Sequence, residues 1–274
     1  MAPDSRASIL RFENVNVSFE GVDVLQDLTF EAVEGESRVI LGAAGSGKTV
    51  LLKTALGLVR PDSGKVLVFG RDITSLREQQ LFEIRSKIGM LFQESALFDS
   101  LTIEENVAYP LLNQKCIHCP KEQVHPRVVE ALDFVELGGT LEKFPSELSG
   151  GMRRRAAIAR AVVTVPPLVL YDSPTAGLDP ITAHTIIALL IKERDISHTT
   201  TLLVTQRYQD GNLIANFRYN SNRGGLEPAG NGAGPGARTI FMVLREGRLV
   251  FEGDQDQLEA STDSYITKFV KQRV

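Results

Sequence analysis

An eight-residue loop near the start of the chain constrains its fold more than any other feature. Residues 42–49 read GAAGSGKT and match the pattern G-x-x-x-x-G-K-[ST]. In such a loop the glycines let backbone N–H groups converge on phosphate oxygens, and the following helix adds its positive N-terminal end. The alternative is a plain Gly-rich turn. The phosphate loop is favoured because an apolar strand precedes it at residues 38–41 and an apolar helix follows at residues 49–59.

This loop predicts a site for a nucleoside triphosphate with Mg²⁺. Lys48 is placed to reach the outer phosphates, and the Thr49 hydroxyl is placed to bind Mg²⁺. The predicted binding set is the whole loop and the residue after it: Gly42, Ala43, Ala44, Gly45, Ser46, Gly47, Lys48, Thr49 and Val50.

A buried strand downstream supplies a partner for the metal. Residues 167–172 read PLVLYD, an apolar strand that ends in Asp172. In proteins with this type of loop, a carboxylate at such a strand end holds Mg²⁺. The alternative is an aspartate that caps the next helix. The metal role is favoured because the strand that ends in Asp172 lies downstream of the phosphate loop.

The remaining pattern predicts an α/β fold, as a single domain over residues 1–274. Residues 9–33 alternate apolar and polar side chains, which predicts short strands with turns in an N-terminal antiparallel β-subdomain. Further strands at residues 65–69, 168–171 and 200–205, with a helix at 182–193, belong to a P-loop α/β core. Residues 93–161 read as helices broken by prolines, an inserted helical subdomain.

The C-terminal third has a different composition. Residues 219–238 are rich in Gly, Asn and Pro, which predicts a flexible insertion with a linker at residues 230–236. Residues 239–252 predict a hairpin that turns at Glu246 and Gly247, and residues 257–270 predict a closing helix.

Composition excludes several classes of protein. A net charge of −4 argues against a general binder of nucleic acid, and two cysteines argue against a disulfide scaffold and fit a reducing compartment. No apolar run approaches the roughly 18 residues that a membrane-spanning helix needs, and residues 1–11 lack the apolar core of a signal peptide. Any role at a membrane is therefore expected to go through a partner.

A second motif lies just before the PLVLYD strand. Residues 147–163 read ELSGGMRRRAAIARAVV and resemble the signature of ABC (ATP-binding cassette) proteins. In that family this loop reaches across a dimer to the γ-phosphate of the opposite subunit, which implies binding roles for Ser149, Gly150 and Gly151. Alone, the segment could be a helix start with an Arg-rich solvated face. Its arginines are separated by Ala and Ile, which favours a packed amphipathic helix over an RNA-binding surface.

Other segments match the family in order, so that the resemblance covers residues 9–205 and resumes weakly at 239–258. Gln93, in IGMLFQ, resembles the glutamine that binds Mg²⁺ and senses a membrane partner; the alternative is an ordinary strand-end residue. AGLDP, at residues 176–180, resembles the family's dimer-seam loop and places Asp179 there. Phe19 stands where the family stacks an aromatic ring on adenine, and a core phenylalanine is the alternative.

The resemblance implies an ABC-type cassette that binds ATP and Mg²⁺ and pairs with a second ATP-binding subunit, as a homodimer or heterodimer. It implies a separate membrane permease as partner, no nucleic acid, and a cytoplasmic position on the inner face of the cell membrane. Residues 90–111, Met152 and GLDPIT at 177–182 resemble the ATPases of Mla/Mce-type phospholipid transporters. Division-associated ABC ATPases and amino-acid importers share much of this pattern.

Two positions depart from the family. Ser173 stands where a catalytic Glu follows the strand-end aspartate, and Gln206 stands where a switch His is expected. A hydroxyl is a poor base near neutral pH, so hydrolysis is in doubt. Three explanations stay open: slow hydrolysis by a substitute arrangement, a degenerate half of an unequal pair, or a nucleotide-gated regulator. The catalytic set under the first is Lys48, Gln93, Asp172, Ser173 and Gln206.

Cys116 and Cys119 form a C-x-x-C with His118 between them and His125 beyond. Structural zinc sites usually need two well-spaced pairs of ligands. We therefore expect an exposed loop here rather than metal or redox chemistry.

Overall fold

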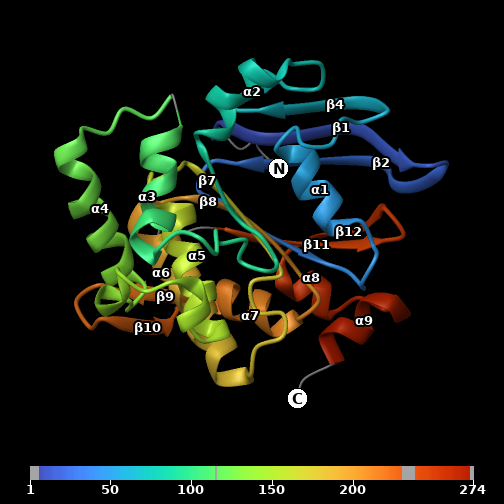
Figure 1. Ribbon diagram of the computed structural model, residues 1–274. Coiled ribbons are helices and arrows are strands. Elements are labelled where there is room, and N and C mark those ends of the chain that lie inside the picture. Colours follow the sequence, from blue (N-terminus) through green and yellow to red (C-terminus); the bar gives the residue numbers. More distant parts are fainter. Residues whose placement is uncertain (1–5, 115, 230–237, 272–274) are drawn as a thin grey trace.

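The computed structural model describes residues 6–114, 116–229 and 238–271. Its two larger sheets lie one above the other, with a helical lobe at one side (Figure 1). The larger sheet has the strand order β12-β11-β3-β8-β7-β6, and the smaller has the order β2-β1-β4-β5. This is the α/β cassette architecture that the sequence predicts, with an antiparallel subdomain beside a mostly parallel core.

The larger sheet positions the predicted site. Strands β3 (Ser37–Leu41), β8 (Thr200–Thr205), β7 (Leu168–Asp172), β6 (Ile88–Leu91) and β11 (Thr239–Arg245) run parallel, and β12 (Arg248–Gly253) pairs antiparallel with β11. Every residue of β3, β7 and β8 is buried, as expected for parallel strands covered on both faces. The carboxyl ends of these strands meet at one edge, so the segments after them lie together.

The smaller sheet corrects one prediction. Residues 9–33 form two long strands rather than several short ones, β1 (Ser8–Phe19) and β2 (Val22–Val33), with irregular register where bulges occur. Strand β1 also pairs with β4 (Ser63–Val68), which pairs with β5 (Arg71–Asp72).

The helix after the loop, α1 (Lys48–Ala55), is shorter than predicted, and Gly57 follows it with a φ of 64°. A short α2 (Glu78–Arg85) comes before β6.

The helical lobe follows the prediction for residues 93–161. It contains α3 (Ile103–Asn113), α4 (Lys121–Phe134) and α5 (Gly150–Val162), with single 3₁₀ turns η1 (Gly138–Thr140) and η2 (Pro145–Glu147) between α4 and α5. Helices α6 (Pro180–Ser197) and α7 (Tyr208–Asn216) return the chain to the core. No helix among the described residues is long and apolar enough to cross a membrane.

The insertion predicted as flexible from residue 219 is partly wrong. Strands β9 (Phe217–Asn220) and β10 (Gly225–Pro228) form a hairpin against α6. The Tyr219 N–H donates to Asp195 at 2.7 Å, and Lys192 lies over the Tyr219 ring. These tertiary contacts order a segment whose composition predicts a loop. The predicted linker at 230–236 lies outside the described residues.

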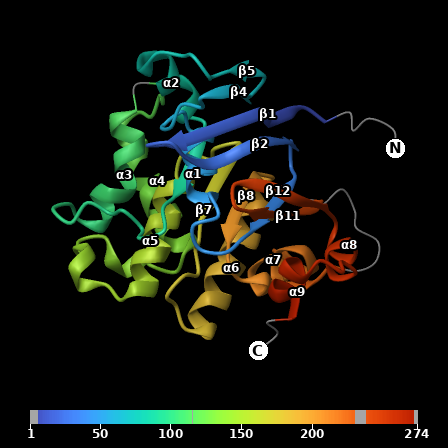
Figure 2. The same ribbon diagram turned by 90° about the vertical axis from the view of Figure 1, so that its right-hand side faces the viewer.

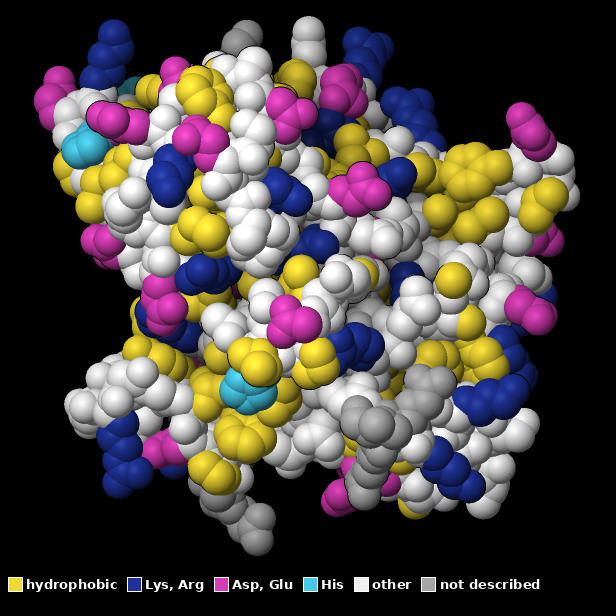
Figure 3. Space-filling view, turned by 60° about the horizontal axis from the view of Figure 1, so that its bottom comes forward, with side chains coloured by type: hydrophobic (Ala, Val, Ile, Leu, Met, Phe, Trp, Pro, Cys, Tyr) yellow, Lys and Arg dark blue, Asp and Glu magenta, His cyan; other side chains and the backbone are white. Residues whose placement is uncertain are grey.

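The single closing helix predicted at residues 257–270 is also wrong. The structure has two helices, α8 (Gln255–Glu259) and α9 (Ser264–Lys271). The Asp263 carboxylate accepts from the Tyr265 N–H at 2.7 Å and starts a new helix there. Viewed from the end that carries these elements, acidic and basic side chains are interspersed over the surface (Figure 3).

Candidate nucleotide-binding site

The phosphate loop packs so closely against its neighbours that only glycine fits at two places. A Cβ on Gly42 would lie 2.7 Å from the Leu244 carbonyl oxygen, and one on Gly47 would lie 2.7 Å from the Val24 carbonyl oxygen. Gly47 also has a φ of 100°, which side-chain-bearing residues rarely adopt. Strands β11 and β2 therefore fix the loop's shape before any ligand arrives.

The Lys48 side chain folds back onto the start of this loop. Its Nζ donates to the Gly42 carbonyl at 2.8 Å and to the Ala43 carbonyl at 2.7 Å. Burial lowers the pKa of Lys48 to about 8, although the nearby Asp172 carboxylate acts in the opposite direction. An anionic ligand beside Lys48 would favour its charged form and raise this pKa.

One cavity of about 300 Å³ brings most of the predicted site together. Residues 44–50, three residues that follow strand ends and one residue of β2 line it, whereas the predicted Gly42 and Ala43 do not: Ala44, Gly45, Ser46, Gly47, Lys48, Thr49, Val50, Gln93, Ser173, Gln206 and Val24. Asp172 is buried beside the cavity, and its carboxylate accepts from the Ser173 hydroxyl at 3.2 Å. Sequence reasoning missed Val24, because no local motif marks a residue that reaches the loop from the antiparallel sheet.

The two departures from the family face this same cavity. Ser173 is in the left-handed region, with a φ of 48°, and its N–H donates to the Val204 carbonyl at 2.9 Å. Gln206 follows β8 and is exposed. No carboxylate and no histidine is among the residues that line the cavity. The described residues therefore provide phosphate-binding groups but no evident base at the cavity wall.

A buried carboxylate contacts the two chain segments that carry Ser173 and Gln206. Asp210, on α7, is 2% exposed and accepts from the Thr175 hydroxyl at 2.6 Å and from the Thr205 hydroxyl at 2.7 Å. Burial raises the pKa of Asp210, while the threonine hydrogen bonds and the Arg207 charge oppose that rise. These contacts link the segment after Ser173 to the residue before Gln206. The sequence alone assigns no role to residues 207–210, which read RYQD.

Several predicted residues do not line the cavity. Phe19 ends β1 and is 47% exposed, so the alternative of a core phenylalanine is wrong, and adenine stacking stays a prediction. Ser149 caps α5 by accepting from the Met152 N–H at 3.2 Å, and Gly150 is exposed next to it. A Cβ on Gly151 would lie 2.7 Å from Thr182 Cγ2. Asp179 caps α6, accepting from the Thr182 N–H at 3.0 Å.

The cysteine segment shows no metal cluster in the part of the chain that is described. Cys116 is an exposed free thiol, and Cys119 is half-buried. The His125 Nδ1 lies 2.6 Å from Glu104, on the neighbouring helix, and so has a partner other than the thiols.

Comparison with known proteins identifies the class. Residues 25–176 match the family model described as ABC transporter, and the chain belongs to this family. It is similar to the intermembrane phospholipid transport system ATP-binding protein MlaF of Haemophilus influenzae, 32% identical over 93% of this chain and 88% of that protein. It is also similar to the probable ribonucleotide transport ATP-binding protein mkl of Mycobacterium leprae, 39% identical over 72% of this chain. The chain spans only 56% of the length of that relative.

A solved structure agrees with the fold. The ATP-binding cassette MJ0796, a dimer in a post-hydrolysis state bound to ADP and Pi, superimposes with a TM-score of 0.74. It is 28% identical, and the match covers 90% of this chain and 98% of that one. The chain is therefore an ABC transporter ATP-binding subunit by family and by fold.

The residues present fit ATP with Mg²⁺. The start of α1 offers backbone N–H groups and an ammonium to phosphates, and Thr49, Gln93 and Asp172 offer the oxygen ligands that Mg²⁺ prefers.

Proposed function

We propose that this chain binds ATP and Mg²⁺ and couples their binding and hydrolysis to substrate movement by a separate membrane permease. The observation that carries the proposal is the single cavity that Lys48, Thr49, Gln93, Ser173 and Gln206 share, with Asp172 beside it. ATP binding is a property of the family to which the chain belongs.

Each residue has a distinct part in this proposal. Lys48 turns from the Gly42 and Ala43 carbonyls toward the outer phosphates, and the N–H groups at the start of α1 hold the others. Thr49, Gln93 and Asp172 would hold the metal, which would supply positive charge that lowers the barrier to phosphoryl transfer. Gln206 donates a neutral hydrogen bond toward the γ-phosphate, and Ser173 orients water without serving as a strong base.

Turnover is therefore expected to be slow. Positioning and charge stabilisation carry much of phosphoryl transfer, so the loss of a carboxylate lowers the rate without abolishing it. The second candidate function is a hydrolysis-deficient regulatory or structural subunit. The cavity favours this candidate only in one respect, the absence of a carboxylate and a histidine from its lining.

A dimer would complete the site. Ser149, Gly150 and Gly151 lie at the start of α5 and do not line the cavity of their own chain. In a head-to-tail pair they would present N–H groups and a helix N-terminus to the γ-phosphate bound by the partner subunit. MJ0796, which shares the fold, is a dimer.

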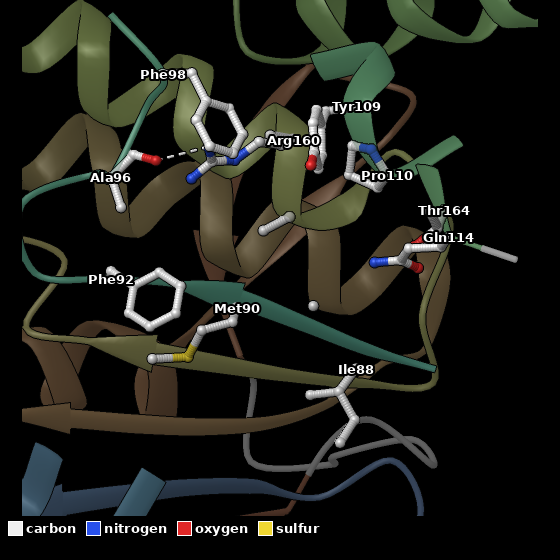
Figure 4. Close-up of a pocket in the computed structure, with 12 residues that line it drawn as sticks. Ile88, Met90, Phe92, Ala96, Phe98, Tyr109, Pro110, Gln114, Arg160 and Thr164 are labelled. Carbon is white, nitrogen blue, oxygen red and sulfur yellow. Dashed lines mark hydrogen bonds between the residues drawn. The ribbon is translucent and has the colours of Figure 1, made fainter. Parts of the chain in front are cut away.

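We propose that the permease contacts this chain at a second cavity, of about 390 Å³. Figure 4 shows Ile88, Met90 and Phe92 along one wall and Phe98, Tyr109 and Pro110 along the other. Arg160 fixes the loop between them, donating to the Ala96 carbonyl at 2.7 Å and to the Ser95 carbonyl at 2.8 Å. Since this loop begins next to Gln93, an apolar permease helix seated here would sense the nucleotide site.

The proposed cargo is phospholipid or a related hydrophobic molecule, moved by a permease with this chain on the cytoplasmic face of the membrane. The support is the match to MlaF over most of both chains. The relative named for ribonucleotide transport aligns over a shorter stretch, so direct measurement must decide the cargo.

The test is to purify the chain from detergent-solubilised membranes with and without Phe98→Glu, using Phe82→Glu as a matched exposed control on α2. We expect a multi-spanning membrane protein to co-purify with the natural chain and the control and to be lost from Phe98→Glu. In vesicles the recovered complex should move fluorescent phospholipid when ATP is added. A chain that binds ATP but brings down no membrane protein supports the regulator, and a complex that moves no phospholipid contradicts the cargo.

A further inference from the structure

The C-terminal helix α9 reaches the phosphate loop directly. The Ala43 N–H donates to the Tyr265 hydroxyl at 3.0 Å, and that hydroxyl donates to the Leu244 carbonyl at 3.2 Å. One side-chain oxygen thus joins the first turn of the loop to the neighbouring strand β11. Helices α8 and α9 lie together at the C-terminal end of the molecule, beside α7 (Figure 2).

Contacts within α9 and with β11 hold Tyr265 in this position. Its N–H donates to Asp263, its ring meets Phe269 edge-on at 5.2 Å between centroids, and the Arg245 guanidinium lies 5.6 Å from its ring centroid. Arg245 also pairs with Asp263 at 3.6 Å. The hydroxyl is therefore presented by a ring that is already packed, and little conformational freedom is lost when it binds the loop.

Helix α8 anchors the same unit beside the other end of the site. The Gln255 Nε2 donates to the Tyr208 hydroxyl at 2.8 Å, and that hydroxyl donates to Glu259. Tyr208 is buried and lies two residues after Gln206. The α8–α9 unit thus contacts both the phosphate loop and the segment that follows the switch position.

We propose that Tyr265 is a positioning residue that holds the first turn of the phosphate loop in its binding shape through Ala43. In the free chain, Lys48 Nζ donates to two carbonyls of this turn, those of Gly42 and Ala43. When Lys48 turns toward phosphate, it releases these carbonyls, and the Tyr265 hydroxyl still holds this turn through the Ala43 N–H. Its loss weakens the nucleotide-bound state more than the free state. This inference rests on the proposed binding of ATP.

The experiment compares Tyr265→Phe with Tyr219→Phe in the full chain. Phenylalanine keeps the ring contacts of residue 265 and removes only the hydroxyl, and Tyr219 lies on the β9 hairpin away from the loop. We expect Tyr265→Phe to raise the dissociation constant for ATP with Mg²⁺ by roughly three- to tenfold, the usual effect of losing one neutral hydrogen bond. Tyr219→Phe should leave it unchanged, and the Tm of both nucleotide-free variants should stay close to that of the natural chain.

Two results would overturn the inference alone. If Tyr265→Phe binds ATP as the natural chain does, the hydroxyl does not position the loop. If its nucleotide-free Tm falls while ATP affinity is unchanged, the hydroxyl serves only to pack α9. Failure of the natural chain to bind ATP would instead remove the proposed function, and this inference with it.

Discussion

The phosphate loop and the strand ends opposite it line one cavity but present different chemistry. On the loop side, Lys48 and Thr49 line the cavity, and close contacts require glycine at residues 42 and 47, so this side offers positive charge and a fixed backbone shape. On the other side, Ser173 and Gln206 offer only a hydroxyl and an amide. The comparison teaches that binding and hydrolysis depend on different features: binding needs backbone shape and positive charge, whereas rapid hydrolysis also needs a group that handles the proton of water.

The largest expected effect comes from restoring the family's Glu and His at residues 173 and 206, on the side opposite the phosphate loop. The double change Ser173→Glu/Gln206→His should raise the rate of phosphate release by about 10²- to 10⁴-fold, the range for a positioned general base. The matched control is Ser173→Gln/Gln206→His, which has the same length at residue 173 without a carboxylate. Equal rates for the natural chain and the Glu variant would mean that other groups already supply the base.

Removing the positive charge from the phosphate loop should have the next largest effect. Lys48→Ala should weaken ATP binding about 100-fold, because each hydrogen bond from a charged donor contributes roughly 1.5–3 kcal/mol. The measurement is equilibrium binding, with Lys53→Ala as the control because Lys53 is an exposed residue on the same helix. Unchanged affinity in Lys48→Ala would place the nucleotide elsewhere.

The buried carboxylate behind the cavity should matter for stability. Asp210→Ala should lower the free energy of unfolding by about 1–3 kcal/mol, because the Thr175 and Thr205 hydroxyls lose their acceptor. Asp210→Asn keeps an acceptor oxygen and should cost less. Urea unfolding checks both, with Asp99→Ala as an exposed control. A loss no greater than that of the control would show that these hydrogen bonds contribute nothing.

The smallest effect is a pH dependence of binding. The pKa of Lys48 is lowered to about 8 in the free chain, and bound phosphates would raise it. Above pH 8, binding then takes up a proton, so affinity should fall by up to about tenfold per pH unit, while below pH 8 Lys48 contributes little change. Lys48→Arg should remove this dependence because arginine stays charged. The same slope in Lys48→Arg would contradict the assignment to Lys48.

Much of the site could be predicted because its parts are contiguous in sequence. The loop at residues 42–49 carries its own pattern, and the strands before Asp172 and Gln206 are uniformly apolar or β-branched. Their meeting at one edge follows from parallel pairing of β3, β8 and β7. Val24, Asp210 and Tyr265 had no such signal, because each reaches the site from a distant segment through tertiary contacts.

Two errors in the fold prediction have different causes. The Gly-, Asn- and Pro-rich composition predicts a flexible insertion at residues 219–238, but packing of Tyr219 against α6 stabilises a hairpin at residues 217–228. The sequence predicts one helix over residues 257–270, but the Asp263 side chain caps the start of a second helix. The first error comes from a tertiary contact that the local pattern does not reveal. The second comes from a local side-chain cap, since the Asp263 carboxylate accepts from backbone N–H groups only two and three residues further on.

The most direct test of the central claim is to measure bound nucleotide and released phosphate in one sample of the purified chain with ATP and Mg²⁺. The account predicts saturable ATP binding, with phosphate released far more slowly than by Ser173→Glu/Gln206→His. Absence of saturable binding would contradict an intact phosphate loop. Release as fast as that of the restored variant would contradict the claim that the opposite side of the cavity limits hydrolysis.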